Sequence, residues 1–528
     1  MNGKRWMSHY REALTTAGIR ILDMDENGLA PAHRVVLDAD DWGTAGRLAA
    51  EAGLRWAGAW ADPFDGEIRV HACLEEGGQD LVLEARIPAD RPEIPSHAPW
   101  FAGADRLERH IHDLIGVVFT DHPDPRRWTR HQAWEADRFP LHPDFPVDGQ
   151  PPAITPADTD YPFVPVKGSG VYEIPVGPVH AGIIEPGHFR FHANGEDVLR
   201  LEERLGYVHK GIEKIAVDRD PAGLARLAGR VSGDSTVAHT WAACQAMERA
   251  AGAGIPARAQ YLRALLAERE RIANHLGDVG AICNDVGFAF AHAQCGALRE
   301  AWQRNSRTLF GHRLLMDAVV PGGVARDIDA DAVRVLRAEA GELRRKVRPL
   351  FDILTDHPPL DDRLITTGQL SVETALALGA TGYVGKASGL DRDLRRDAAY
   401  APYEDLDVTV PVFKDGDVSA RMRVRIEEIG ISLGLVTRLL DRLPDGAIRA
   451  ELSTPAAGAA GLGRIEGWRG DILTYIRFGE DGRIARFFPR DPSWFTWPTL
   501  ERLIHGNIVP DFPVCNKSVN GSYSGVDL

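Results

Sequence analysis

The stretch from Gly177 to His239 constrains the fold of this chain most strongly, because it combines a strand pair, a tight turn and a helix start in a fixed order. Apolar residues alternate with polar ones on either side of Asn194-Gly195. Asn-Gly is the strongest short-range signal of a two-residue hairpin turn, so two antiparallel strands are predicted here. From near Ser235 the apolar spacing changes to three and four residues, which predicts a helix.

Composition limits the classes of protein to which the chain can belong. Its 528 residues, 44% of them hydrophobic, are enough for at least two domains with cores of their own. A net charge of −15 argues against a nucleic-acid partner and against adhesion to anionic lipid. The five cysteines include no C-x-x-C pair, so we expect no disulfide framework and a reducing, cytoplasmic setting.

No segment of the sequence is predicted to cross a membrane. The N-terminus lacks the apolar core of a signal peptide. The longest weakly polar run, Gly280 to Leu298, is interrupted by Asn284, Asp285, His292 and Gln294 and is too polar to span a bilayer. We therefore expect no direct membrane span, and any membrane link must come through partner subunits.

The chain divides into two predicted domains, and the fold class is α+β. Residues 1–147 are predicted to form a small α/β domain with short strands at 35–37, 54–56, 68–72 and 81–85. Residues 148–165 are rich in proline, aspartate and small residues, which is typical of an extended linker. Residues 166–528 are predicted to be mainly helical after a short N-terminal sheet. Helices are expected from Pro256 and over Gln294–Ala318, Asp329–Asp356 and Arg423–Leu443, with a closing hairpin of strands 472–476 and 484–488.

Two segments carry a resemblance to a known family. The sequence from Gly177, with Arg-Val-Ser-Gly-Asp-Ser at 230–235, resembles the large subunits of energy-converting (group 4) nickel–iron (NiFe) hydrogenases of the hydrogenase-4/formate-hydrogenlyase type. It also resembles the related 49-kDa subunit of respiratory complex I. Residues 107–147 resemble the C-terminal signature of the 30-kDa subunit of complex I, which these hydrogenases carry fused to the large subunit. The resemblance implies a fused assembly domain followed by a hydrogenase-like domain.

The resemblance also identifies what the chain lacks. Hydrogenases of this family hold nickel and iron with Arg-Val-Cys-Gly-x-Cys and a second C-x-x-C near the C-terminus. The corresponding positions here are Ser232, Ser235, Ser522 and Gly525. Nickel–iron centres need soft thiolates, so we expect no metal and no cofactor bound by this chain, and the chain resembles a cysteine-less, hydrogenase-related branch. It ends three residues after Gly525, from which we expect no processed C-terminal peptide.

Three residues are candidates for proton handling in the emptied site. Glu185 matches the glutamate that passes protons near the metal in hydrogenases, and His188 lies near the position of the quinone-facing histidine of complex I. A carboxylate and an imidazole this close can exchange protons near neutral pH, but they can equally close the hairpin turn by hydrogen bonds. Asp234 is predicted to cap the following helix, with a proton role as the alternative. Gly233 stands where complex I has a quinone-binding tyrosine.

The resemblance implies a catalytic-type large subunit of a membrane-bound oxidoreductase without a NiFe centre. It would couple electrons from a partner's 4Fe-4S cluster to reduction of a quinone-like or unidentified acceptor and to proton or ion translocation. The implied partners are a small iron–sulfur subunit of the complex I 20-kDa type, a ferredoxin-like subunit and antiporter-like membrane subunits. Such a chain would lie peripherally on the cytoplasmic side of the cell membrane. The alternatives are a structural subunit with a vestigial cavity and an active NiFe hydrogenase, which needs ligands that the sequence lacks.

Overall fold

The computed structural model describes residues 4–131, 134–149, 161–181 and 184–528. Its N-terminal part is a five-stranded sheet of order β1-β2-β5-β4-β3, in which β2 and β5 are parallel and the other pairs antiparallel. The elements are α1 (Lys4–Thr16), β1 (Ile21–Leu29), β2 (Ala32–Leu37), α2 (Trp42–Glu51), β3 (Arg55–Phe64), β4 (Glu67–Glu76), β5 (Gln79–Pro88), β6 (Glu93–Pro95), α3 (Asp105–Ile115) and β7 (Val118–Thr120). All four predicted strands are confirmed. The fifth, β1, was not predicted because acidic residues interrupt its apolar pattern.

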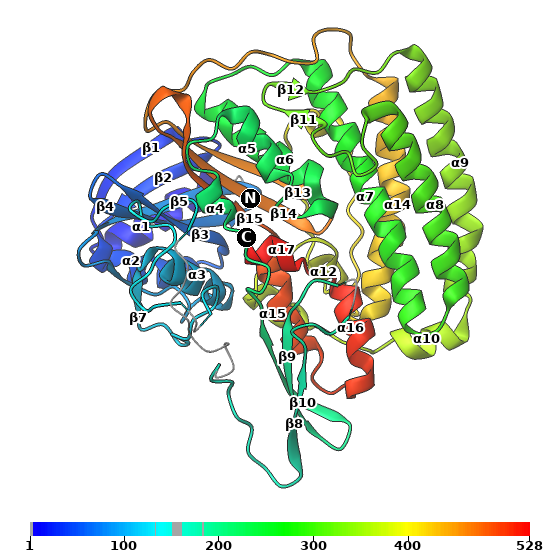
Figure 1. Ribbon diagram of the computed structural model, residues 1–528, viewed down its shortest axis with the longest axis horizontal. Coiled ribbons are helices and arrows are strands. Elements are labelled where there is room, and N and C mark those ends of the chain that lie inside the picture. The colour runs from blue at the N-terminus through cyan, green and yellow to red at the C-terminus, as the bar shows by residue number, and fades with distance from the viewer. Residues whose placement is uncertain (1–3, 132–133, 150–160, 182–183) are drawn as a thin grey trace.

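The predicted hairpin after Gly177 is confirmed. β9 (His188–Asn194) pairs antiparallel with β10 (Asp197–Arg204), and Asn194 lies opposite Asp197 across the turn. A strand that was not predicted, β8 (Val171–Val176), adds to the free edge of β9. Figure 1 shows this sheet projecting from the body of the molecule below the C-terminal helices.

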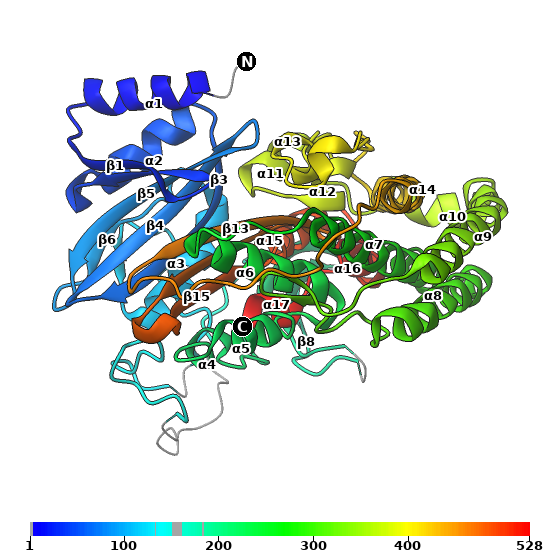
Figure 2. The same ribbon diagram turned by 90° about the horizontal axis from the view of Figure 1, so that it is seen from above.

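Long helices form the other side of the molecule. α7, α8, α9 and α14 lie side by side in Figures 1 and 2, away from the N-terminal sheet. The helices of this part are α4 (Ile212–Ile215), α5 (Pro221–Ala228), α6 (Thr236–Ala250), α7 (Ala257–Asp285), α8 (Ala289–Phe310), α9 (Ala330–Thr355), α10 (Pro358–Leu364), α11 (Val372–Ala377), α12 (Gly382–Ala387), α13 (Leu394–Asp397), α14 (Val418–Asp441), α15 (Ser493–Leu503), α16 (Phe512–Val519) and α17 (Tyr523–Asp527), and two short strands are β11 (Val319–Val320) and β12 (Gly323–Val324).

Most of the predicted helices are confirmed, with one difference in extent. Those expected from Pro256, over Asp329–Asp356 and over Arg423–Leu443 correspond to α7, α9 and α14. The helix expected over Gln294–Ala318 instead begins at Ala289 and ends at Phe310. It ends there because Gly311 takes up a left-handed conformation (φ 93°), which is a common way to terminate a helix.

A three-stranded sheet of β13 (Ala460–Gly467), β14 (Gly470–Phe478) and β15 (Ile484–Arg490) supports α6. The predicted closing hairpin is β14 and β15. A side chain at Gly461 would come within 2.1 Å of the Ala246 carbonyl oxygen, and one at Gly463 within 2.0 Å of the Ala242 oxygen. These glycines let the backbone of α6 lie directly on β13. They also weaken the strand pattern of β13, which is why that strand was not predicted.

Buried ion pairs join this sheet to the N-terminal part. The Asp471 carboxylate accepts hydrogen bonds from Arg55 (2.8 Å), Arg464 (2.8 Å) and Arg490 (2.6 Å). Arg55 belongs to β3, and the other three residues to β13–β15. The predicted linker 148–165 falls largely on residues 150–160, which lie outside the described residues, and the predicted domain limits stay a prediction.

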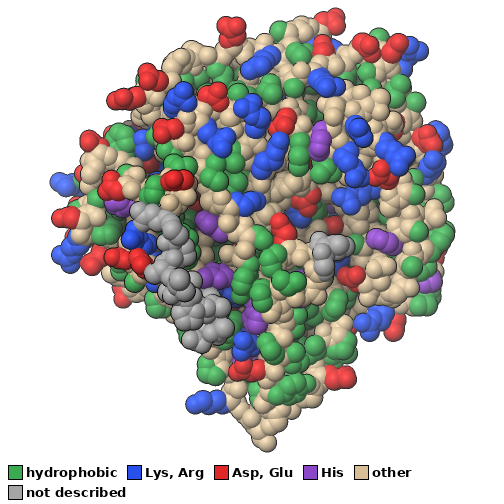
Figure 3. Space-filling view, viewed as in Figure 1, with side chains coloured by type: hydrophobic (Ala, Val, Ile, Leu, Met, Phe, Trp, Pro, Cys, Tyr) green, Lys and Arg blue, Asp and Glu red, His purple; other side chains and the backbone are tan. Residues whose placement is uncertain are grey.

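The face of the molecule shown in Figure 3 carries basic and acidic side chains in an interspersed pattern, and hydrophobic side chains gather in its lower middle. Within the described ranges, every helix is too short or too polar to cross a membrane.

Candidate functional site

A cavity of about 740 Å³ lies between the loop before β9, the start of α6 and the C-terminal helices α16 and α17. Segments more than 300 residues apart in sequence meet here. The polar and charged residues that line it are His180, Glu185, Ser232, Asp234, Asp285, Arg469, Asn516, Lys517, Asn520, Ser522, Tyr523 and Ser524.

The neighbouring helix α7 fixes the start of α6. Glu270 accepts hydrogen bonds from the backbone N–H groups of Val237 (2.7 Å) and Ala238 (3.2 Å), which have no partner inside the helix. Burial raises the pKa of Glu270 to about 8, although these hydrogen bonds act in the opposite direction. Asn274, one turn further on, donates to the Asp234 carbonyl oxygen (2.7 Å). Two side chains of α7 therefore fix this region: Glu270 binds the first N–H groups of α6, and Asn274 binds the loop 232–235 that precedes it.

Asp234 forms an ion pair with Arg469. The guanidinium donates to both carboxylate oxygens, at 2.6 and 2.7 Å, and the Ser232 hydroxyl donates to one of them at 2.8 Å. Burial alone would raise the pKa of Asp234, but Arg469 and Ser232 hold it below its ordinary value. The prediction that Asp234 caps the helix is wrong, since Glu270 accepts from the N–H groups of α6 and the Asp234 side chain is bound to Arg469.

Residues from the four positions predicted to correspond to the family's thiolates lie near one another. The hydroxyl oxygens of Ser232 and Ser522 lie 2.9 Å apart, and Gly525 N–H donates to Ser522 Oγ (3.0 Å). Because the Ser232 proton is directed to Asp234, Ser522 is the donor to Ser232. Ser235 Oγ accepts a longer hydrogen bond from Arg469 (3.3 Å). Hydroxyl groups thus form a connected hydrogen-bonded set at this wall of the cavity.

A carboxylate occupies the space next to Gly525. A β-carbon at Gly525 would lie 2.7 Å from Asp491 Cγ and 3.0 Å from Ser522 Cβ. Asp491 itself accepts from His239 Nε2 (2.8 Å) and Ser493 N (2.8 Å). Burial would raise the pKa of Asp491, but the bond from His239 lowers it to about 2.

These residues do not fit a nickel–iron centre. Hydroxyls and a hydrogen-bonded carboxylate stand where the family uses thiolates, and such hard oxygen donors do not replace soft sulfur ligands. In the part of the chain that the structure describes, no group of three or more histidines, cysteines or acidic residues is arranged to hold a metal ion.

The two other candidate residues lie in different surroundings. Glu185 is exposed at the cavity, and its Oε2 accepts from Ser524 N (3.0 Å). His188 begins β9, is buried, and is not among the cavity-lining residues. Its Nδ1 lies 3.3 Å from the Gly177 carbonyl oxygen, and burial lowers its pKa. The structure thus places Glu185, but not His188, in the lining of the cavity, and the proton-handling role of both residues stays a prediction.

Sequence reasoning missed two residue pairs of the site. His180 Nε2 lies 3.2 Å from the Tyr523 hydroxyl, and this imidazole, rather than that of His188, lines the cavity. Burial lowers the pKa of His180 and raises that of Tyr523. Arg469 lies in the turn between β13 and β14, 235 residues from Asp234. The two histidines His180 and His188, close together before the predicted hairpin, were a signal for His180, but nothing local marks Arg469.

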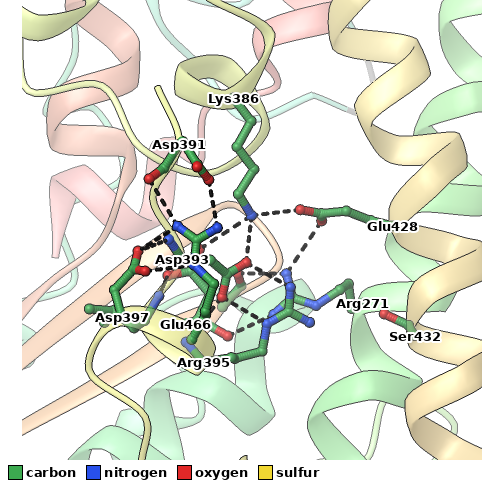
Figure 4. A network of polar contacts seen from close by, with 12 residues as sticks. Arg271, Lys386, Asp391, Asp393, Arg395, Asp397, Glu428, Ser432 and Glu466 are labelled. Carbon is green, nitrogen blue, oxygen red and sulfur yellow. Dashed lines mark hydrogen bonds and ion pairs between the residues drawn. The ribbon is translucent and has the colours of Figure 1, made fainter. Parts of the chain in front are cut away.

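A second polar cluster is buried between α7, α12, α13, α14 and β13. Figure 4 shows Lys386 pointing toward Glu428 and Asp393; its Nζ donates to each at 2.7 Å. Arg395 joins Asp393 to Glu268, and His275 Nε2 lies 2.7 Å from Glu428. The clustered cations lower the pKa of Glu428 well below its ordinary value although burial acts to raise it.

A chain of hydrogen bonds leads from the cavity toward this cluster. Arg469 donates to the Asn520 carbonyl oxygen (2.7 Å), and Asn520 Nδ2 donates to Asp278 (2.9 Å). Arg425 donates to the other oxygen of Asp278 (3.0 Å). Arg425 lies one helical turn from Glu428 on α14, so this chain of hydrogen bonds ends beside the second cluster.

Family models match three successive parts of the chain. Residues 37–151 match the 30-kDa subunit of respiratory-chain NADH dehydrogenase, and residues 285–460 match its 49-kDa subunit. Residues 210–277, which include the start of α6 and most of α7, match the nickel-dependent hydrogenases. The expected fold class, a small 30-kDa-like domain followed by a larger and mainly helical 49-kDa-like one, is confirmed.

Whole-chain similarity extends over both parts. The chain is 33% identical to formate hydrogenlyase subunit 5 of Escherichia coli K12, over 85% of this chain and 79% of that protein. It is 32% identical to hydrogenase-4 component G of the same organism, over 88% and 81%. A solved structure of the membrane-bound sulfane sulfur reductase, an archaeal respiratory membrane complex, contains a chain that superposes with a TM-score of 0.64 and 26% identity, over 69% of this chain and 100% of that one. The chain therefore belongs to the family of membrane-bound hydrogenase and complex I-like large subunits, as a member in which 30-kDa-like and 49-kDa-like parts are fused.

Proposed function

We propose that this chain is the large subunit of a hydrogenase-related, complex I-like oxidoreductase that works without a nickel–iron centre. One observation carries the proposal. Three of the four positions that would bear thiolates carry serine hydroxyls, two of which, Ser232 and Ser522, lie 2.9 Å apart, and Asp491 fills the space beside the fourth, Gly525. The cavity keeps its ionisable walls, so what it retains is the capacity to bind a small acceptor and to move protons to it.

The chemistry of the cavity suits a small polar acceptor. Asp234 and Arg469 neutralise one another, whereas Glu185, His180 and Lys517 border the same space. A quinone-like headgroup fits these hydrogen-bonding walls. Another small polar acceptor fits as well, and the structural relative is named for the reduction of sulfane sulfur. In either case electrons would arrive from a 4Fe-4S cluster on a partner subunit.

The buried polar chain supports coupling to proton or ion movement. It runs from Arg469 through Asn520, Asp278 and Arg425 toward the Lys386–Glu428 cluster. A change of charge at the acceptor would change the electrostatic energy of the charged groups along this chain, because charges interact strongly in a low-dielectric interior.

The proposed setting follows the family. Residues 1–147 would be the assembly domain, 148–165 the linker and 166–528 the hydrogenase-like domain. The partners would be a small iron–sulfur subunit of the complex I 20-kDa type, a ferredoxin-like subunit and antiporter-like membrane subunits. The antiporter-like membrane subunits would hold the chain peripherally on the cytoplasmic side of the membrane.

A structural subunit with a vestigial cavity is the second candidate. The observation that favours it is that the hydroxyls and carboxylates at the former ligand positions are satisfied by one another, by Arg469 and by His239. Substitution of Glu185 distinguishes the two candidate functions. Its carboxylate has a single described hydrogen bond, from Ser524 N, and is accessible in the cavity.

The test is Glu185→Gln in the assembled complex, read out as electron transfer to a quinone analogue across a pH series. If Glu185 carries protons, the rate falls by about 100-fold and the pH profile changes. His188→Ala is expected to lower stability and leave the profile unchanged, and Glu196→Gln at the exposed hairpin turn is the matched control. An assembled Glu185→Gln complex with unchanged activity favours the structural function.

A further inference from the structure

A second large cavity lies where the N-terminal part meets α6 and α7. Its volume is about 620 Å³, and none of its lining residues belongs to the cavity described above. Its lining includes Gly78, Gln79 and Asp80 at the β4–β5 turn, residues of α6, and the segment 398–401. Cavities of this size between domains are a common place for small-molecule sites.

Arg249, on the last turn of α6, brings a positive charge into this cavity without a counter-ion. Its guanidinium donates one hydrogen bond, to the Leu462 carbonyl oxygen (2.6 Å). Among the described residues no carboxylate forms an ion pair with it. Burial lowers the pKa of Arg249 to about 10, and the charges of Asp80 and Glu248 oppose that shift only in part. Arg249 is half-buried and its guanidinium has no ion-pair partner, so an anion placed beside it in the cavity would be stabilising.

The other charges that line the cavity are already matched. Glu248 accepts from Arg263 at 2.9 and 2.5 Å, and Asp80 is bound to Arg464. Three arginines therefore face two carboxylates, which leaves one positive charge in excess, that of Arg249.

An uncharged group in the cavity also has unused hydrogen-bonding capacity. Gln245 accepts from Arg464 N (2.8 Å) through its Oε1, which leaves its NH₂ group free to donate to a ligand. The aromatic side chains of Trp241 and Tyr400 offer an apolar surface in the same cavity.

We propose that this interdomain cavity binds a small organic anion, a carboxylate or phosphate, with Arg249 as its counter-ion and Trp241 and Tyr400 against its carbon body. Arginine suits this role because its planar guanidinium binds such oxyanions through two hydrogen bonds. The ligand would contact both walls and so strengthen the contact between the domains. The inference is independent of the function proposed for the other cavity.

The experiment measures equilibrium binding of phenyl phosphate, benzoate and phenol to the purified complex. Both anions are expected to saturate one site per chain, whereas uncharged phenol does not bind. Arg249→Gln is expected to weaken anion binding by about tenfold or more, because it removes a charge-assisted contact. Arg334→Gln, which changes an exposed arginine of α9, is the matched control and is expected to bind as the wild type does.

A second variant keeps the test decisive if Arg249→Gln does not fold. Gln260→Glu introduces a carboxylate of nearly the same shape into the lining, and this carboxylate repels the ligand or takes its place beside Arg249. It too is expected to weaken anion binding by about tenfold or more. Absence of saturable anion binding to the wild type would overturn the proposal, and so would wild-type affinity in the folded variants.

Discussion

At the residue scale, Gly525 and Asp491 show how the site is packed where the family is expected to carry a thiolate. The glycine leaves room for a carboxylate, and the carboxylate is fixed by His239 and by Ser493 N. The sequence indicated the loss of the thiolates through the resemblance, but not what replaces them. Asp491 and Arg469 lie hundreds of residues from their partners His239 and Asp234, and no local pattern predicts such contacts.

Gly525→Ala is therefore expected to destabilise the protein by about 1–3 kcal/mol, because the new methyl group overlaps Asp491 in a packed interior. Gly430→Ala is the matched control. Gly430 lies within α14 with nothing near its missing side chain, so alanine there should be neutral or stabilising by up to about 1 kcal/mol. Chemical denaturation of the two variants checks this, and equal stabilities would show that Asp491 does not fill the site.

At the element scale, the start of α6 depends on a side chain from another helix. The hydrophobic spacing predicted the helix and its beginning near Ser235 correctly, yet it assigned the cap to Asp234. Glu270 performs that role from α7, and Arg469 binds Asp234 instead. Capping by a distant element is a property of the tertiary packing, so spacing along the sequence predicts the helix without predicting the cap.

The pKa of Glu270, raised to about 8 from an ordinary value of 4.5, predicts a pH dependence with a definite sign. Between these values the folded state holds a proton that the unfolded state has lost, so the contribution of Glu270 to stability falls as pH rises from about 4.5 to 8. A glutamine at position 270 is neutral at every pH in this range, so the Glu270→Gln variant does not lose stability in this way. Relative to the wild type, the variant is expected to gain stability with rising pH, by at most about 1.4 kcal/mol per pH unit.

The check is urea denaturation of both proteins at several pH values in that window. Glu427→Gln, at an exposed position of α14, is the control and should differ from the wild type by less than about 0.5 kcal/mol throughout. A difference between Glu270→Gln and the wild type that does not change with pH would mean that Glu270 is ionised throughout this range.

At the scale of the whole molecule, buried charges hold the two parts together. Composition and resemblance predicted two parts and their order, and the short strands of the first part were predicted from alternation. The interface itself was not predictable, because Arg55 and Asp471 are 416 residues apart and look like ordinary surface charges in the sequence. The Arg334–Asp331 pair also joins an arginine to an aspartate, but both of its side chains are exposed to solvent.

Asp471→Ala is expected to destabilise the protein by about 3–5 kcal/mol, because it leaves Arg55, Arg464 and Arg490 buried without their shared partner. Asp331→Ala removes one exposed partner and should change stability by less than about 1 kcal/mol. Denaturation midpoints of the two variants give the comparison. Similar midpoints would show that the Asp471 cluster does not hold the parts together.

The nature of the cavity at Ser232, Asp234 and Ser522 is decided by metal analysis combined with hydrogen turnover on the intact complex purified from membranes. A hydroxyl-lined site without thiolates predicts no stoichiometric nickel, iron accounted for by iron–sulfur clusters alone, and no hydrogen evolution or uptake. One nickel per chain together with hydrogen turnover would contradict this interpretation and would require a ligand set other than the four positions identified here.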